Sequence, residues 1–251
     1  MKAAGLDLGS VNTKLVILDN GKPVFKKAVP SRFDPVSVGR ELLEEACREY
    51  EPAETVVTGY GRVSFPENRV VTEITCQAKG CHYFFPEVPY ILDLGGQDAK
   101  VIKKNAQGKV VSFVMNDKCA AGTGRFLDVI FKGLDLRPED TDSAAEAEPV
   151  PINSMCTVFA ESEVITLLAK GTPKTSVVAG LFKSTATRLA RFIETQGQAD
   201  TLVFTGGGAH YRPLVRLLAE QIAAEIVIPP EPELTAALGA ALIANRAQTT
   251  L

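Results

Sequence analysis

Two stretches with the same pattern decide the fold: GLDLGSVNTKLVILDNGKPVFKKAV at residues 5–29 and ILDLGGQDAKVIKKNAQGKVVSFVM at residues 91–115. Each reads as a strand that ends in small residues, a second strand, a tight turn and a third strand. Asn20-Gly21 supplies the positive φ angles that a tight hairpin turn needs, and Gln107-Gly108 stands at the equivalent place. The repeat predicts two α/β halves that arose by internal duplication, each opening with an antiparallel set of strands.

The remaining elements are predicted from apolar spacing and from helix-start signals such as Asp34 followed by Pro35. Further strands are expected at TVVTG, at TLVFTGGG and at EIVI. The polar stretch RPEDTDSAAEAEPVP fits either a short surface helix or a loop. Helices are expected over about residues 35–49, 73–85, 123–133, 158–170, 175–196 and 212–223, with a last one that ends near 246.

Composition excludes several classes of protein. The 251 residues are 45% hydrophobic and 23% charged, which fits a compact protein of one large or two small domains and excludes a disordered or collagen-like chain. A net charge of -3 gives no overall attraction to nucleic acid or anionic lipid. No run reaches the roughly 18 apolar residues of a spanning helix, and the N-terminus lacks the apolar core of a signal peptide. We therefore expect a cytoplasmic protein that binds neither nucleic acid nor membrane.

Three segments share one design, an apolar strand that ends in small residues: 5–10, 92–97 and 203–208. Without side-chain bulk, their backbone N–H groups can approach and bind anionic oxygens. In the first two, Asp7 and Asp93 precede the glycine by two residues, where a carboxylate can hold Mg²⁺ through water. One such turn is usually only a turn, but three together indicate two like domains that clamp a nucleotide. The Walker pattern and a G-x-G-x-x-G after the first strand are both absent, which disfavours P-loop and Rossmann sites.

The five cysteines are an odd number, which argues against a secreted disulfide framework. Cys119 and Cys156 each precede a predicted helix, where N–H donors and the helix dipole stabilise a thiolate. They are either small buried residues or half of a site for tetrahedral zinc or a [4Fe-4S] cluster, which a C2 homodimer would complete. Cys47 and Cys81 lie on apolar helical stripes and are expected in the core, and Cys76 lacks the further cysteines of a ferredoxin motif.

The three glycine turns resemble the phosphate 1, phosphate 2 and adenosine motifs of the actin, hexokinase and Hsp70 ATPase superfamily. That superfamily's fold is two ribonuclease-H-like domains with ATP in the cleft between them. The resemblance implies one such domain over residues 1–90, on which the last helix could pack, and a second over residues 91–251 that carries the cluster cysteines. It implies that ATP or ADP with Mg²⁺ is held by Asp7, Gly9, Ser10, Asn12, Thr13 and Lys14, by Asp93, Gly95, Gly96 and Gln97, and by Gly206, Gly207 and Gly208. Gln97 is a candidate to orient the attacking water.

A narrower resemblance rests on the cysteine segments. NDKCAAGTGRFLD and SMCTVFAESEVI closely resemble the cluster-bearing segments of the ATP-dependent activators of 2-hydroxyacyl-CoA dehydratases, in the wider family that includes the ATPase subunits of benzoyl-CoA reductase. The segments GYGR, EITCQAKG, LDLGGQDAKV and FTGGG fit the same family in order, over nearly the whole chain. The resemblance implies that Cys119 and Cys156 bind one [4Fe-4S] cluster shared across a homodimer. One departure is Gly208, where a small apolar residue is common.

The resemblance also implies the activity: an ATPase that delivers one low-potential electron. A ferredoxin or flavodoxin would load the cluster, and ATP would change the angle between the cluster-bearing helices. The acceptor would be an iron-sulfur enzyme, namely a 2-hydroxyacyl-CoA dehydratase, a benzoyl-CoA reductase or a double-cubane cluster protein. Two alternatives stay open: a small-molecule kinase of the same fold with Asp98 as its base, and an actin-like or chaperone-like nucleotide switch with no redox step.

Overall fold

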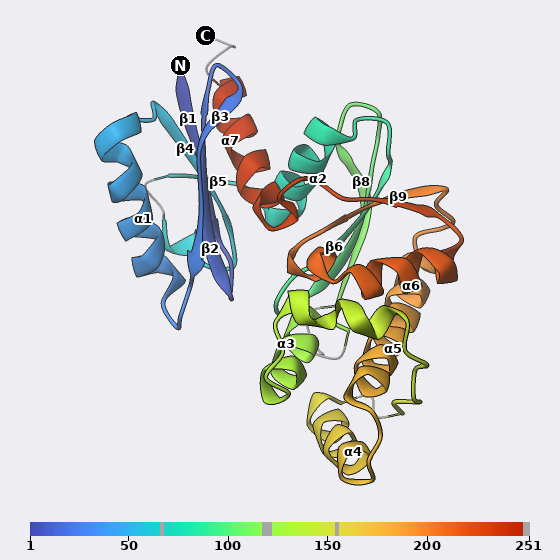
Figure 1. Cartoon of the computed structure of the whole chain (residues 1–251). Coiled ribbons are helices and arrows are strands. Elements are labelled where there is room, and N and C mark those ends of the chain that lie inside the picture. Colours follow the sequence, from blue (N-terminus) through green and yellow to red (C-terminus); the bar gives the residue numbers. More distant parts are fainter. Residues whose placement is uncertain (66–67, 117–121, 154–155, 248–251) are drawn as a thin grey trace. The chain divides into compact units, whose positions relative to one another are not determined.

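The chain folds into two compact units, which we describe separately (Figure 1). This computed structural model describes residues 1–65, 68–116, 122–153 and 156–247. The first unit consists of Met1–Pro89, Ile102–Val111 and Pro229–Leu251, and the second of Tyr90–Val101 and Ser112–Ile228. Both ends of the chain therefore belong to the first unit. Among the described residues, no helix has the length and apolar character needed to cross a membrane.

The first unit is built on a five-stranded mixed sheet of order β3-β2-β1-β4-β5. The first three strands are antiparallel neighbours, as the hairpin pattern predicts, and β4 and β5 join in parallel. Asn20 and Gly21 form the predicted turn with φ angles of 49° and 79°. The strands are β1 (Lys2–Leu8), β2 (Asn12–Asp19), β3 (Lys22–Pro30), β4 (Glu54–Gly59) and β5 (Arg69–Val70).

Helices cover both faces of this sheet (Figure 1). Helix α1 (Pro35–Tyr50) starts where the sequence predicts, because the Asp34 carboxylate accepts a hydrogen bond of 3.0 Å from the Ser37 amide. Helix α7 (Thr235–Ala247) packs on the opposite face, and α2 (Glu73–Phe84) packs against α7. A Cβ at Gly5 in β1 would overlap the Ala237 carbonyl oxygen, so glycine allows the α7 backbone to lie directly on the strand.

The second sheet repeats the strand order of the first: β8-β7-β6-β9-β10. Strands β9 and β10 join β6 in parallel, as β4 and β5 join β1. Two sheets with the same order support the duplication that the sequence predicts. The strands are β6 (Tyr90–Leu94), β7 (Ala99–Lys104), β8 (Val110–Asn116), β9 (Thr201–Thr205) and β10 (Glu225–Val227).

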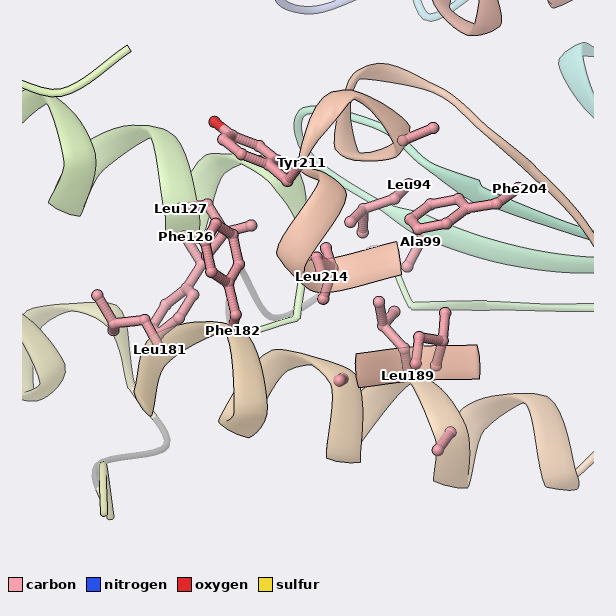
Figure 2. Close-up of a cluster of buried hydrophobic side chains, with 14 of the residues drawn as sticks. Leu94, Ala99, Phe126, Leu127, Leu181, Phe182, Leu189, Phe204, Tyr211 and Leu214 are labelled. Atoms are coloured by element: carbon pink, nitrogen blue, oxygen red, sulfur yellow. The ribbon is translucent and has the colours of Figure 1, made fainter. Parts of the chain in front are cut away.

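An aromatic and aliphatic cluster forms the core of the second unit (Figure 2). Phe131, Phe182 and Tyr211 pack with ring centroids 5.3–5.5 Å apart, distances at which tilted and edge-on ring pairs are favourable. Leu94 and Phe204 contribute from the sheet. Each fully buried large side chain stabilises the fold by about 1.5–3 kcal/mol. The helices are α3 (Gly124–Gly133), α4 (Thr157–Ala169), α5 (Lys174–Glu194) and α6 (Arg212–Ile222).

Helix α4 is the least buried of these helices. Ala160 and Val164 are its buried residues, whereas Val158, Phe159 and Ile165 are exposed. The predicted position of the helix is correct to one residue at each end. The stretch that the sequence left open between helix and loop contains a 3₁₀ helix, η2 (Pro138–Ala145). The other short helices are η1 (Arg62–Ser64), η3 (Gly207–His210) and η4 (Pro232–Leu234).

Candidate functional site

The first unit carries a buried ion pair at the end of β1. Asp7 on β1 stands directly opposite Lys14 on β2, because the antiparallel register pairs the two residues. Lys14 Nζ donates to Asp7 Oδ2 at 2.8 Å. The Lys14 side chain is 16% exposed, so the ammonium group keeps some access to solvent while it neutralises the buried carboxylate.

The turn after β1 is shaped around glycine. A Cβ at Gly9 would lie 2.6 Å from the Asn12 carbonyl oxygen and 2.9 Å from Lys14 Nζ. Ser31 Oγ donates to the Gly9 carbonyl at 2.6 Å and lies 2.9 Å from Thr13 Oγ1. Since the Ser31 hydroxyl donates its one hydrogen to the Gly9 carbonyl, the Thr13 hydroxyl donates to Ser31 Oγ. Thr13 is thus buried behind the turn and supports its shape, while Ser10 and Asn12 are partly exposed.

A further glycine contacts this carboxylate, and the sequence analysis missed it. Parallel pairing sets Thr58 of β4 opposite Asp7, and Gly59 follows with φ +88°. A Cβ at Gly59 would overlap Asp7 Oδ1 and lie 2.7 Å from the Leu8 amide nitrogen. The sequence signal that could have identified Gly59 is the similarity of VVTG at residues 56–59 to VFTG at residues 203–206.

The second unit repeats the ion pair with an added carboxylate. Lys100 on β7 donates to Asp93 Oδ2 at 3.2 Å and to Asp98 Oδ1 at 2.7 Å. Lys100 is 2% exposed, so the lysine is enclosed where Lys14 is not. The Gly95 amide donates to the Asp98 carbonyl at 3.0 Å, and the predicted water-orienting residue Gln97 lies exposed in the same turn. The sequence analysis did not single out Lys100, although it stands as far after Asp93 as Lys14 stands after Asp7.

The predicted adenosine turn lies against the same carboxylate. Asp93 and Thr205 are opposite each other in the parallel pair β6–β9, and Gly206 follows with φ +82°. A Cβ at Gly206 would lie 2.6 Å from Asp93 Oδ1, and one at Gly208 would overlap the Leu94 side chain. Among the described residues, no heavy atom lies within 4 Å of a Cβ built at Gly207. Close approach therefore requires glycine at 206 and 208 but not at 207.

Helix α3 is hydrogen-bonded to the Asp93 turn. The Gly124 amide donates to the Gly95 carbonyl and the Arg125 amide to the Gly96 carbonyl, both at 2.8 Å. These two bonds satisfy N–H groups at the start of the helix, which otherwise lack partners within it. Cys119 precedes this helix in the sequence and lies outside the described residues.

Cys156 is the exposed one among the four described cysteines and is the N-cap residue of α4. Cys81 is buried, as predicted, Cys47 is half-buried, and Cys76 is also buried. Burial raises the pKa of the Cys76 thiol to about 12, which disfavours the thiolate that a metal would bind. Of the described thiols, Cys156 therefore fits a metal site best.

Each unit thus combines a buried aspartate, a lysine and glycine turns that pack closely around the aspartate. Carboxylates of this kind bind hydrated Mg²⁺, and close-approach turns bind phosphate oxygens. The lysine in each unit donates a hydrogen bond to its aspartate. We call this group of residues in each unit a half-site; its carboxylate and glycine turns are of the chemical types that bind metal ions and phosphate.

Comparisons with known proteins agree with this description. The model of the BadF/BadG/BcrA/BcrD ATPase family matches residues 4–244. A 2-hydroxyisocaproyl-CoA dehydratase activator from Clostridioides difficile is 40% identical over 253 residues, which cover 97% of this chain and 95% of the relative. A solved structure of an activator of that dehydratase from Clostridium difficile, with bound ADPNP, has a TM-score of 0.92 at 38% identity and covers 100% of this chain and 98% of that one.

The fold extends to more distant proteins. A ROK family glucokinase from Streptomyces griseus has a TM-score of 0.64 at 11% identity, with 98% of this chain and 100% of that chain covered. At that identity the likeness shows the fold alone, which is the predicted actin-like ATPase fold. Since the family model and the dehydratase activators match almost all of its length, the chain belongs to the BadF/BadG/BcrA/BcrD ATPase family.

Proposed function

We propose that this ATPase activates an iron-sulfur acceptor enzyme by transferring to it one low-potential electron from a ferredoxin- or flavodoxin-type donor. The acceptor class is a 2-hydroxyacyl-CoA dehydratase, a benzoyl-CoA reductase or a double-cubane cluster protein. The observation that carries the proposal is an exposed thiol, Cys156, at the N-terminus of a sparsely buried helix in a chain that also holds both ATPase half-sites.

The nucleotide half of the proposal uses residues that both half-sites provide. Asp7 and Asp93 would hold hydrated Mg²⁺, and the turns at Gly9 and at Gly95–Gly96 would bind phosphates through backbone N–H groups other than that of Gly95, which donates to the Asp98 carbonyl. Lys14 Nζ lies close to the Gly9 backbone, which supports a role in phosphate binding. The exposed Gln97 amide is free of the core and can orient a water molecule, while Gly206–Gly208 would line the adenosine.

The cluster half of the proposal rests on the chemistry of the thiols. Cys156 is exposed at the N-terminus of a helix, where a metal centre can reach its sulfur. A [4Fe-4S] cluster takes four thiolates, so Cys119 and Cys156 would each need their equivalents from a second copy in a C2 homodimer. When bound, the cluster would accept and release one electron.

Coupling between nucleotide and thiols has a structural basis in the second unit. The first turn of α3 is bonded to Gly95 and Gly96, so a change at the Asp93 turn reaches the helix that follows Cys119. Helix α4 is held by two buried side chains and by Glu163, which accepts a 3.1 Å hydrogen bond from the Asn153 amide. Nucleotide states that bind this turn differently would therefore shift the helix geometry around the cysteines.

The test is an anaerobic visible spectrum with iron quantitation and size-exclusion chromatography. Wild type should be a brown dimer with about four iron atoms per two chains, following the usual cluster stoichiometry. Cys119→Ala and Cys156→Ala should each lose the colour and the iron while ATP binding survives. Cys47→Ala, a half-buried thiol on α1, is the matched control and should keep both.

Iron retained in both Cys119→Ala and Cys156→Ala would defeat the cluster assignment. A colourless wild type that phosphorylates a small molecule would instead favour the kinase alternative. The base in that alternative is Asp98, whose Oδ1 accepts a hydrogen bond from Lys100.

A further inference from the structure

Lys100 is a buried lysine enclosed by two carboxylates. Its side chain is 2% exposed, and its ammonium group lies 3.2 Å from Asp93 Oδ2 and 2.7 Å from Asp98 Oδ1. The Asp93 side chain is equally buried, whereas that of Asp98 is 24% exposed. A buried charge is tolerated only when it is paired, so the three groups form one electrostatic unit.

This unit fixes the aspartate to which the proposed function assigns the magnesium. Asp93 Oδ2 is held by Lys100, and Asp93 Oδ1 faces the Gly206 turn, where a Cβ would come within 2.6 Å. Asp98 Oδ1 accepts a hydrogen bond from the same lysine, and the Asp98 backbone carbonyl accepts one from the Gly95 amide. Lys100 therefore links the strand carboxylate to the turn that carries Gly95.

Lys14 in the first unit differs from Lys100 in how accessible its side chain is to a ligand. It donates to Asp7, has 16% of its side chain exposed and lies beside the Gly9 backbone, so a ligand can reach it. Lys100 is closed off by its two carboxylates. A cation with that degree of enclosure is suited to orient its neighbours and poorly suited to contact a phosphate.

We propose that Lys100 is a positioning residue for ATP hydrolysis, an internal counter-ion that keeps Asp93 and Asp98 together in the geometry needed to hold the metal-bound water and nucleotide. The inference rests on the proposed function for its ATPase step and on the Asp93–Lys100–Asp98 contacts for its chemistry. Without the ammonium group, the two carboxylates repel each other and attract a replacement cation.

That attraction makes chemical rescue the sharpest test. Lys100→Ala removes the side chain but leaves both carboxylates, and the partial exposure of Asp98 gives a small cation a path to them. The n-propylammonium ion reproduces the atoms that this variant lacks. Tetramethylammonium carries the same charge without N–H donors, so it controls for ionic strength.

Lys104 offers a matched control on the same strand. It is equally buried but donates to the Pro86 carbonyl at 2.8 Å and lies 3.5 Å from His82 Nδ1, so it serves a different part of the fold. Lys104→Ala should lower stability through the lost packing and hydrogen bond. It should gain nothing specific from n-propylammonium.

Two readouts are measured on each variant. The first is the thermal unfolding midpoint without nucleotide or magnesium, which n-propylammonium should raise in Lys100→Ala and leave unchanged in Lys104→Ala. The second is the ATPase rate: Lys100→Met should lower kcat by about 10- to 100-fold with KM for ATP changed by less than about 3-fold, as expected when a group is misplaced. In Lys100→Ala, n-propylammonium should restore part of the lost rate.

The two readouts separate failure of the inference from failure of the proposed function. Equal responses of Lys100→Ala and Lys104→Ala to n-propylammonium, or a Lys100→Met kcat within about 2-fold of wild type, would overturn the positioning role. A wild type without ATPase activity would refute the proposed function, and the positioning role with it, even where the unfolding midpoint still shows that Lys100 is a counter-ion.

Discussion

The two half-sites share their parts but differ in what they offer a ligand. In both, an aspartate accepts a hydrogen bond from a lysine on the neighbouring strand and stands opposite a threonine on a parallel strand, and a positive-φ glycine follows that threonine. In the first, Lys14 lies beside the turn backbone and is partly exposed. In the second, Asp98 takes that place: a Cβ at Gly95 would meet Asp98 Oδ1 at 2.7 Å. The duplicated frame thus presents a cation in the first unit and a carboxylate in the second.

The largest expected effect comes from neutralising the aspartates themselves. Asp93→Asn and Asp7→Asn should each lower the ATPase rate by about 100-fold or more, because each removes a charge that the proposed magnesium site requires and weakens the ion pair with the neighbouring lysine. Steady-state ATP hydrolysis measures the loss. A large loss at Asp93 alone would break the equivalence of the two halves and leave Asp7 with a structural role.

The positive-φ glycines should give the next largest effect. Gly206→Ala and Gly59→Ala should each lower the free energy of unfolding by about 2–4 kcal/mol, through backbone strain and overlap with the aspartate. Urea unfolding gives the value. Gly207→Ala, built into open space, is the control and should lie within about 0.5 kcal/mol of wild type. A control as unstable as Gly206→Ala would contradict the argument from close approach.

Replacing the lysine of the first unit should sharpen the contrast with Lys100. Lys14→Met should raise KM for ATP by about 10-fold with a smaller change in kcat, since an accessible cation that contacts phosphate contributes to binding in the ground state as well. Lys100→Met is expected to show the reverse pattern, a lower kcat with little change in KM. The same pattern of changes in kcat and KM for both variants would mean that the two lysines have the same role.

The smallest expected effect concerns a carboxyl of the second unit. Burial raises the pKa of Asp128 from its usual 3.8, against a hydrogen bond from Tyr211 that lowers it. The folded state therefore holds the proton more tightly than the unfolded chain, and stability falls as pH rises above 3.8 through the raised value. Asp128→Asn should remove this pH-dependent loss of stability, which amounts to less than about 1 kcal/mol in the free energy of unfolding after solvent screening. Urea unfolding across that pH range measures it, and parallel curves for the two proteins would contradict it.

Much of the fold could be predicted because its signals are local. The repeated strand and turn pattern gave the three antiparallel strands of the first sheet and the three neighbouring strands of the second, and apolar spacing gave the main helices to within a few residues. Strand β5 was missed because two residues carry no periodicity. The 3₁₀ helix η2 was left undecided because its polar sequence lacks a clear apolar face.

The site was harder to predict, because its missing parts depend on pairing between distant segments. Gly59 contacts Asp7 only because β4 lies beside β1 in one particular register. Ser31 supports the first turn from the end of β3, and no motif marks it. Lys100 reads as an ordinary strand lysine until burial places it between two carboxylates. The roles assigned to the glycine turns, to Gln97 and to Cys119 stay predictions.

The contact between Gly5 and α7 has a consequence for synthesis. Residues 2–8 of β1 leave the ribosome well before residues 235–247, which form the helix that lies on the backbone of this strand. One face of the first sheet therefore stays without this helix until residues 235–247 have been made. A nascent chain stalled before residue 235 should be a good client for chaperones and an easy target for proteases.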